Sequence, residues 1–443
     1  MTDAGLAVGD EVTVEVGPVA HGGHCIARHD GRVLFVRHAL PGETVVARVT
    51  EGGEGDRFLR ADAVSVVVAS PDRVDPACRY AHPGGCGGCD FQHVSLDRQR
   101  LLKADVVREQ FARLARLDLD ALGLMPTVEP VPGDLDGLGW RTRVEFALSP
   151  AGRLGLRGHR SHDVVEVERC VIAADGVNEL VATQGDWLGP DGADREPSTV
   201  EAVDAVAPGL GLPVAVEVGP RGSTGDWPVP LVHEVVHAGG AFHEFEVSAR
   251  SFWQVHPGAA STFADAVLEA LQPRPGDRAL DLYAGVGLFA VALADAVGPT
   301  GQVIAVESDS LAVQTARRNV GERRNVVVAL ARVDDAFGVT RRTPRGRRRR
   351  ASSHKPTRLA WLPERADLVV LDPPRTGAGP EICGAVAALK PRAAAYVACD
   401  PAALARDTAY LAEHGYRLRG LRALDAFPMT HHLECIAHFE VIS

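Results

Sequence analysis

The sequence predicts an α/β fold with a parallel sheet in its C-terminal part, preceded by a small β-barrel and a second β-rich segment. Three observations support this prediction. Short alternating strands follow one another in residues 8–66, continuous apolar strands alternate with helical segments from about residue 258, and the hydrophobic period changes repeatedly in between. Alternating strands are half buried, whereas continuous apolar strands are buried on both faces of a parallel sheet.

The composition is that of a globular protein of two to four domains. The chain has 443 residues, of which 46% are hydrophobic and 5% are aromatic. The first residues lack the pattern of a signal peptide, and no apolar run is long enough for a membrane helix. We therefore expect a cytoplasmic protein with no membrane partner.

The formal net charge of −11 argues against a protein that simply coats nucleic acid. Charge is unevenly distributed, however, because residues 341–355 contain eight basic residues and no acidic one. Phosphate contacts act over about 8–10 Å at physiological salt, so a local basic face can bind RNA on an acidic protein. We expect residues 339–357 to be a disordered insertion, either a solvated loop or an RNA contact.

Residues 1–66 are predicted to form the small barrel. Glu11–Val16, Val33–Val36 and Thr44–Val49 are its clearest strands, and Gly and Pro turns separate them. Five short strands in a segment of this length are typical of a small closed barrel. Residues 67–75 have the composition of a linker.

Residues 67–250 are predicted to form a central β-rich domain. A helical pattern covers residues 95–118, and we expect this helix to pack on the C-terminal domain. Arg143–Leu148 and Val164–Glu168 have the pattern of strands. Residues 183–230 are rich in Gly, Pro and Asp and are expected to form loops with scattered strands.

Residues 251–443 are predicted to form the α/β domain. Asp281, Glu307, Asp372 and Cys399 all fall at predicted strand ends. Ligands of such sheets bind beyond the carboxyl ends of the strands, so these residues are expected to share one site. The pattern predicts strands at 278–282, 303–307, 366–371 and 394–398, and helices at 260–271, 288–297 and 311–320.

The predicted cofactor site is the glycine-rich turn Asp281-Leu282-Tyr283-Ala284-Gly285-Val286-Gly287. Glycine lets the backbone approach a ligand closely, and the helix N-terminus that follows favours negative charge. Glu307 ends the next strand, where a carboxylate can accept hydrogen bonds from ribose hydroxyls. With Ala290 the spacing also fits a dinucleotide fingerprint. The position of Asp281, and Asp372-Pro373-Pro374-Arg375 downstream, favour S-adenosylmethionine over NAD.

Cys399 lies where a predicted strand stops at Pro401. In sequence it stands between two acidic motifs, one with Asp372 and the other, His431-His432-Leu433-Glu434, with Glu434. A thiol at the edge of a sheet with a carboxylate on either side suggests covalent catalysis. A buried structural cysteine is the alternative.

A second group of thiols, Cys78, Cys86 and Cys89, has the character of a metal-ligand motif. Glycines between them permit the sharp turns that bring thiolates to one centre. A cytosolic enzyme is not expected to form disulfides. The alternatives are therefore an iron–sulfur cluster and a zinc ion bound with the help of His82 or His93.

In combination these motifs resemble the RNA uracil-C5 methyltransferase family, in particular the 23S ribosomal RNA type with an N-terminal TRAM barrel and an iron–sulfur cluster. The resemblance runs through nearly the whole chain, with the motifs in the order of the family. The matching segments are Gly9–Val49, Cys78, Cys86, Cys89, Cys170, Ser251–Val255, Asp281–Phe289, Asp372–Arg375, Tyr396–Pro401 and His431–Glu434.

The resemblance implies three domains and one reaction. They are a TRAM barrel at 1–66, a central β-rich iron–sulfur domain at 67–250, and an α/β Rossmann-like class I methyltransferase domain at 251–443. The implied reaction is S-adenosylmethionine-dependent methylation of C5 of a uridine in structured RNA by a monomeric enzyme. Ribosomal RNA is the expected partner, and transfer RNA is the alternative.

The resemblance also assigns the site residues. Cys399 is implied as the nucleophile that adds to C6, Glu434 as the base that removes the C5 proton, and Asp372 as a hydrogen-bonding group between base and cofactor. The implied contacts of S-adenosylmethionine are Gln254, Tyr283, Gly285, Gly287, Glu307 and Asp372, and the implied ligands of a [4Fe-4S] cluster are Cys78, Cys86, Cys89 and Cys170.

The sequence departs from the family pattern at several positions. Asp400 replaces the usual Asn, and a carboxylate there is expected to raise the pKa of the neighbouring Cys399 thiol. Leu288 replaces an Asn, which removes a polar cofactor contact. The spacing from Cys78 to Cys86 is wider than in the family, and Val171 replaces the Pro after the fourth cysteine.

Two other classes of function compete with a methyltransferase. A non-catalytic RNA-binding protein would account for the barrel and the arginine-rich segment. A dehydrogenase with NAD at the glycine turn would leave Cys399 and Glu434 unexplained. Binding of S-adenosylmethionine separates both from the first hypothesis.

Overall fold

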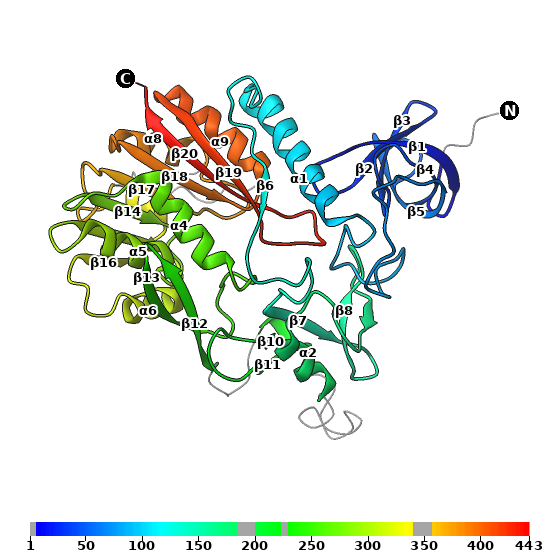
Figure 1. The fold of residues 1–443 in the computed structure, drawn as a ribbon, viewed down its shortest axis with the longest axis horizontal. Helices are drawn as coiled ribbons and strands as arrows, with labels where there is room; N and C mark the ends of the chain where they lie inside the picture. The colour runs from blue at the N-terminus through cyan, green and yellow to red at the C-terminus, as the bar shows by residue number, and fades with distance from the viewer. Residues whose placement is uncertain (1–5, 184–199, 223–228, 340–356, 443) are drawn as a thin grey trace.

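The computed structural model describes residues 6–183, 200–222, 229–339 and 357–442. The predicted basic insertion lies almost entirely outside these residues, as does part of the segment 183–230. A closed barrel, a five-stranded sheet, a two-stranded hairpin and an eight-stranded sheet make up the β structure of the described chain (Figure 1). None of its described helices has the length and apolar character needed to cross a membrane.

The N-terminal strands close into a barrel, which confirms the prediction. Residues of β1 alternate between solvent and the barrel interior, where Val12, Val14 and Val16 are buried. This period of two is what a half-buried strand requires. The strands, in the order β1-β2-β3-β5-β4 around the barrel, are β1 (Glu11–Val19), β2 (Cys25–His29), β3 (Arg32–Arg37), β5 (Phe58–Val68) and β4 (Thr44–Glu51).

The central segment forms an antiparallel five-stranded sheet with α2 (Asp175–Ala182) packed on it through Val177 and Val181. The strands β10 and β11 lie in the region where we expected mainly loops. Their short valine-rich runs are flanked by Gly and Pro, and this composition concealed them. In sheet order the strands are β11 (Val214–Val218), β10 (Ala202–Val206), β7 (Arg143–Leu148), β8 (Leu154–Arg157) and β9 (Val164–Glu166).

The C-terminal sheet has eight strands. The predicted parallel sheet is present, and the antiparallel strands beside it were not predicted. Five strands, β16 to β18 in space, run parallel, whereas β20 pairs antiparallel with both β18 and β19. Because β19 and β20 are antiparallel neighbours, the connection between them needs no crossover helix. The order is β16 (Val326–Leu330), β15 (Gln302–Glu307), β14 (Arg278–Leu282), β17 (Leu368–Leu371), β18 (Ala393–Ala398), β20 (Glu434–Val441), β19 (Tyr416–Asp425) and β6 (Val128–Pro130).

Helices cover both faces of this sheet, as the continuous apolar strands predicted. Alternate residues of one strand enter opposite cores: Ala279 packs with one helical layer, and Leu280 packs with the other. One layer contains α4 (Ala259–Leu271), α5 (Leu288–Val297), α6 (Ser310–Asn319) and the hairpin of β12 (Leu231–Ala238) and β13 (Ala241–Ser248). The other contains α1 (Leu96–Gln110) with its π-helical extension Phe111–Ala115, α7 (Val333–Phe337), α8 (Pro380–Ala388) and α9 (Pro401–Glu413).

Candidate active site and cysteine pocket

The carboxyl ends of the parallel strands open on a cavity of about 950 Å³, here called the reaction cavity. Loops that follow β14, β15, β17 and β18 supply much of its wall, as the strand-end positions predicted. All but one of the residues predicted for catalysis and cofactor binding line it, namely Gln254, Tyr283, Gly285, Glu307, Asp372, Cys399 and Glu434. The exception is Gly287.

The glycine turn has the backbone geometry of a ligand-binding loop. Tyr283 and Gly285 have φ angles of 67° and 55°, and a Cβ added to Gly285 would meet no atom within 4 Å. The Gly285 N–H donates to Glu307 Oε2 at 3.0 Å, which ties the turn to the end of β15. Gly287 has a φ angle of 93° and lies against Ala316 of α6, so it serves the packing of α5. Leu288, in place of the expected Asn, gives the cavity an apolar wall.

Sheet register brings Cys399 and Glu434 together. Ala398 at the end of β18 pairs with Cys435 at the start of β20 in antiparallel register. The next residue on one strand and the preceding residue on the other, Cys399 and Glu434, therefore lie opposite each other at the cavity. Burial, followed by the charge of Glu434, raises the pKa of the Cys399 thiol to about 11, although Arg375 opposes the shift.

The carboxyl groups of the cavity have raised pKa values. Burial, followed by the charge of Asp372, raises the pKa of Glu434 well above its usual range. Burial and the nearby Glu307 raise the pKa of Asp372 to about 7. Asp281 beneath them is fully buried, and its pKa rises to about 8. Raised carboxyl pKa values suit groups that exchange protons near neutral pH.

Asp400 has a different role from the one its position suggested. Among the groups that shift the Cys399 pKa, its charge has the smallest effect. Its carboxylate caps α9 by accepting from Ala403 N at 2.8 Å, and it pairs with His21 Nε2 at 3.2 Å. These partners lower the pKa of Asp400 against the effect of burial. The expected direction of the effect of Asp400 on the Cys399 pKa is found, but burial and Glu434 contribute more to the shift.

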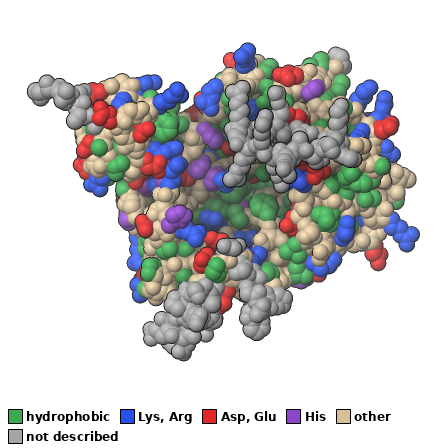
Figure 2. Space-filling view, turned by 180° about the vertical axis from the view of Figure 1, so that it is seen from behind, with side chains coloured by type: hydrophobic (Ala, Val, Ile, Leu, Met, Phe, Trp, Pro, Cys, Tyr) green, Lys and Arg blue, Asp and Glu red, His purple; other side chains and the backbone are tan. Residues whose placement is uncertain are grey.

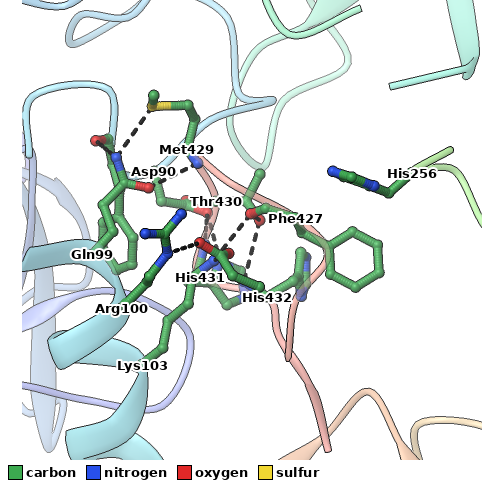
Figure 3. A network of polar contacts seen from close by, with 12 residues as sticks. Asp90, Gln99, Arg100, Lys103, His256, Phe427, Met429, Thr430, His431 and His432 are labelled. Atoms are coloured by element: carbon green, nitrogen blue, oxygen red, sulfur yellow. Dashed lines mark hydrogen bonds and ion pairs between the residues drawn. The ribbon is translucent and has the colours of Figure 1, made fainter. Parts of the chain in front are cut away.

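The loop 426–433 that leads into Glu434 is fixed by helix α1 (Figure 3). Lys103, fully buried, donates to Asp425 Oδ1 at 2.5 Å and to the Phe427 carbonyl at 3.1 Å. Gln99 accepts from Met429 N at 2.8 Å. A buried pair of this kind is costly to break, because one partner alone would leave an unpaired charge.

The same loop is tied to the cysteine segment. Asp90, adjacent to Cys89, accepts from His431 N at 3.1 Å, and its Oδ2 lies 2.6 Å from His431 Nδ1 (Figure 3). The hydrogen bonds from His431 lower the pKa of Asp90 although the carboxyl is buried. The N–H groups of Asp90 and Phe91 also donate to the Met429 carbonyl, each at 3.0 Å. Several hydrogen bonds thus link the cysteine segment to the loop that leads into Glu434.

The four predicted cluster ligands, Cys78, Cys86, Cys89 and Cys170, line one pocket of about 40 Å³, here called the cysteine pocket. Gly88 N donates to Cys86 Sγ at 3.4 Å, and Gln92 Nε2 donates to Cys89 Sγ at 3.6 Å. Burial raises the pKa of Cys86, Cys89 and Cys170, and neighbouring thiols add to the shift.

A metal-binding arrangement is nevertheless missing from the described part of the chain. No group of three or more His, Cys, Asp or Glu side chains there is arranged to hold a metal ion. Neither His82 nor His93 lines the cysteine pocket, and His93 Nε2 lies 3.4 Å from the Ala39 carbonyl of the barrel. The four thiols therefore share one pocket, and their positions alone do not establish a metal site.

Some residues at the reaction centre gave no signal in the sequence. Phe427 lines the reaction cavity, and His21 reaches Asp400 from the barrel, at the other end of the chain. Neither lies in a recognisable motif, because each depends on a tertiary contact that no local pattern records. Phe427 could be placed only by knowing how β19 pairs with β20. His21 could be placed only by knowing where the barrel lies against the C-terminal domain.

Family models match both ends of the chain. The model described as tRNA (Uracil-5-)-methyltransferase matches residues 230–441. The model of the TRAM domain matches residues 6–64, which contain the barrel. The two matches cover the reaction cavity and the barrel loop that approaches it.

Relatives of similar length match almost the whole chain. It is 47% identical to a protein of Streptomyces avermitilis named as an RNA methyltransferase, over 98% of this chain and 99% of the relative. It is 28% identical to the 23S rRNA (uracil(1939)-C(5))-methyltransferase RlmD of Shewanella sediminis, over 97% of this chain and 96% of that one.

A solved structure shares the fold. The tRNA (uracil-54, C5)-methyltransferase of Pyrococcus abyssi, in complex with S-adenosyl-L-homocysteine, matches with a TM-score of 0.66 and 20% identity. The match covers 97% of this chain and 100% of that chain. The chain therefore belongs to the RNA uracil-C5 methyltransferases, and it shares the fold of the Pyrococcus abyssi enzyme.

Proposed function

We propose that this protein methylates C5 of a uridine in 23S ribosomal RNA through a covalent bond between Cys399 and C6 of the base. One observation carries the proposal: the β18–β20 register sets Cys399 opposite Glu434 in the cavity that the glycine turn also lines. A thiol, a carboxyl group and a cofactor loop in one cavity are the components that this reaction needs.

Each residue has one task in the proposed reaction. The Cys399 thiolate forms a bond to C6, which makes C5 nucleophilic. S-adenosylmethionine supplies the methyl group from its sulfonium. Glu434 then removes the proton from C5, and the electron pair of that bond expels the Cys399 thiolate. The raised pKa of the Glu434 carboxyl suits it to hold this proton.

The cofactor fits the residues around the glycine turn. Gly285 leaves open space at the cavity wall, and Gln254, Tyr283 and Glu307 surround the same volume. We assign contacts with S-adenosylmethionine to these four residues and to Asp372, which lines the same cavity. Gly287 is assigned an indirect part, since it lets α5 approach α6 behind the turn.

Ribosomal RNA is the preferred substrate because the RlmD relative, named for 23S rRNA, aligns with nearly the whole chain, barrel included. Transfer RNA is the second candidate, because the Pyrococcus abyssi structure with the same fold is a tRNA methyltransferase. The barrel is assigned to RNA binding in either case.

The experiment uses ribosomal and transfer RNA purified separately from a strain that lacks the gene. Each fraction is incubated with the protein and methyl-labelled S-adenosylmethionine, and nucleosides are identified by mass spectrometry. We expect labelled 5-methyluridine in 23S rRNA. Label in transfer RNA alone would select the second candidate, and the absence of 5-methyluridine from both would contradict the proposal.

We propose further that the cysteine pocket holds a [4Fe-4S] cluster on Cys78, Cys86, Cys89 and Cys170. The support is the shared pocket and the N–H donors directed at two of the sulfurs, an environment that suits iron-bound thiolates. Anaerobic purification followed by iron and sulfide analysis is the test. Zinc in place of iron and sulfide would reject the cluster.

A further inference from the structure

A second cavity lies beside the reaction centre, at the junction between the barrel and the C-terminal domain. Its volume is about 130 Å³, and we call it the junction pocket. Cys399 and Arg375 line both this pocket and the reaction cavity. A chain whose nucleotide reaches Cys399 in the reaction cavity can therefore continue into the junction pocket.

The barrel loop 20–24 closes one side of the junction pocket and contacts both catalytic segments. His21 Nε2 lies 3.2 Å from Asp400 Oδ2, next to the nucleophile. Gly23 has a φ angle of 81°, and a Cβ added there would lie 2.5 Å from His431 Cβ, which is too close for a non-bonded contact. The loop thus packs directly on the segment that carries Glu434.

The walls of the junction pocket suit a flat, polar ring. The rings of His431 and His432 lie 4.0 Å apart, centroid to centroid, and buried Phe91 lines the same space. Burial, reinforced by His431, lowers the pKa of His432 to about 3, so this imidazole is neutral and able to stack. Histidine side chains are visible where the barrel meets the rest of the molecule (Figure 2).

Charge in the junction pocket favours a nucleic acid. Arg375 is exposed and makes no hydrogen bond or ion pair with any other described residue, so its guanidinium is available to a phosphate. The one carboxylate in the pocket wall, Asp400, is already matched by His21 and the N-terminus of α9. A cavity of about 150 Å³ accepts benzene, so this one has the size of a single ring and is too small for a second cofactor.

We propose that the junction pocket binds the base of a nucleotide next to the target uridine in the RNA. The inference rests on the proposed function and extends it: the barrel loop is part of the substrate site and does more than tether RNA. Sequence-specific readers of RNA commonly hold unstacked bases against aromatic or histidine rings, which is the chemistry that this pocket offers.

Steady-state kinetics test the proposal with total RNA from a strain that lacks the gene. We expect His21→Ala and His432→Ala each to raise KM for RNA about tenfold, as for a lost stacking contact, while kcat and KM for S-adenosylmethionine stay within about twofold. The control is His414→Ala, because His414 caps the opposite end of α9 from Cys399.

Two kinetic outcomes would overturn the proposal. An unchanged KM for RNA in both variants, with or without a fall in kcat, would mean that the histidines only position the catalytic loops. An equal rise in KM for RNA in Asp400→Asn would attribute the effect of His21 to its ion pair. If the wild-type protein methylates no uridine, the proposed methyltransferase function itself is wrong, whatever the variants show.

Ultraviolet crosslinking gives a second measurement that needs no variant. The wild-type protein is irradiated with the same total RNA, digested, and searched for peptides that carry a nucleotide. We expect adducts on peptides that contain residues 20–24 or 429–433. Adducts confined to the barrel surface and the reaction cavity would contradict the junction pocket as a base site.

Discussion

The reaction cavity and the cysteine pocket both contain buried thiols, but the neighbours of those thiols differ. Burial raises the pKa of Cys399 in one and of Cys86 and Cys89 in the other. Cys399 faces Glu434 and Arg375 across a cavity of about 950 Å³, whereas the other thiols face one another in about 40 Å³. Burial therefore does not distinguish a nucleophile from a metal ligand; the surrounding charges and the available volume do.

The two sites are also connected. Asp90 follows Cys89 in the chain and holds His431, which begins the motif that ends at Glu434. A change at the cysteine pocket can therefore reach the proposed base through the hydrogen bonds of Asp90 and Phe91 with residues 429–431.

The largest effect is expected for Cys399→Ala. Without the thiol no bond to C6 can form, so methyl transfer to RNA should fall by at least about a thousandfold. Cys25→Ala is the matched control, because Cys25 is buried in the barrel, where its thiol donates to the Ala39 carbonyl at 3.3 Å. Full activity in the Cys399 variant, measured with labelled methyl donor, would exclude covalent catalysis by this residue.

A smaller loss is expected for Cys89→Ser. Removal of one proposed iron ligand should abolish the visible absorption of the cluster and loosen the segment that holds His431. Methylation should fall about 10- to 100-fold, as for a misplaced catalytic group. The two readouts are iron content and rate. Loss of iron with an unchanged rate would show that the cysteine pocket does not position Glu434.

The pH dependence of alkylation reports the Cys399 pKa. Only the thiolate reacts, and the pKa is raised to about 11, so labelling by iodoacetamide should accelerate about tenfold per pH unit between pH 7 and 10. Arg375→Met should slow it, because the arginine lowers that pKa; exposed Arg365→Met is the control. A rate that levels off near pH 8 would contradict the assigned pKa.

The smallest effect is expected for Asp400→Asn. Asn still caps α9, and the charge of Asp400 contributes less to the Cys399 pKa than any other charge that shifts it. The alkylation rate of Cys399 at fixed pH should change by no more than about twofold. A tenfold acceleration would show that the Asp400 carboxylate has a large effect on the Cys399 pKa, against this prediction.

The sequence predicted most of the residues that line the reaction cavity, but not the tertiary contacts that position them. Cys399 and Asp372 were found because each follows directly after an apolar run that predicts a strand. The carboxyl ends of the strands of a parallel sheet meet at one edge. The direct opposition of Cys399 and Glu434 could not be predicted, because it depends on an antiparallel pairing of β18 with β20. Period and composition do not report that pairing.

The remaining differences have similar causes. Scattered strands were expected in residues 183–230, but the positions of β10 and β11 were not predicted because short strands between Gly-rich turns resemble loops. The contact of His21 with Asp400 joins the first and last parts of the chain, and no local pattern encodes it. The sequence predicted the direction of the effect of Asp400 on the Cys399 pKa, but adjacency to Cys399 does not reveal that its carboxylate is bound by His21 and Ala403.

The most direct test of the account is the mass of the complex that Glu434→Gln forms with RNA and S-adenosylmethionine. The glutamine keeps the shape of the side chain but cannot take the C5 proton, so the Cys399 bond should persist. After nuclease and protease digestion, we expect a Cys399 peptide that carries a methylated uridine nucleotide. Glu440→Gln, at the other end of β20, should give none. Normal turnover in Glu434→Gln without an adduct at Cys399 would contradict the account.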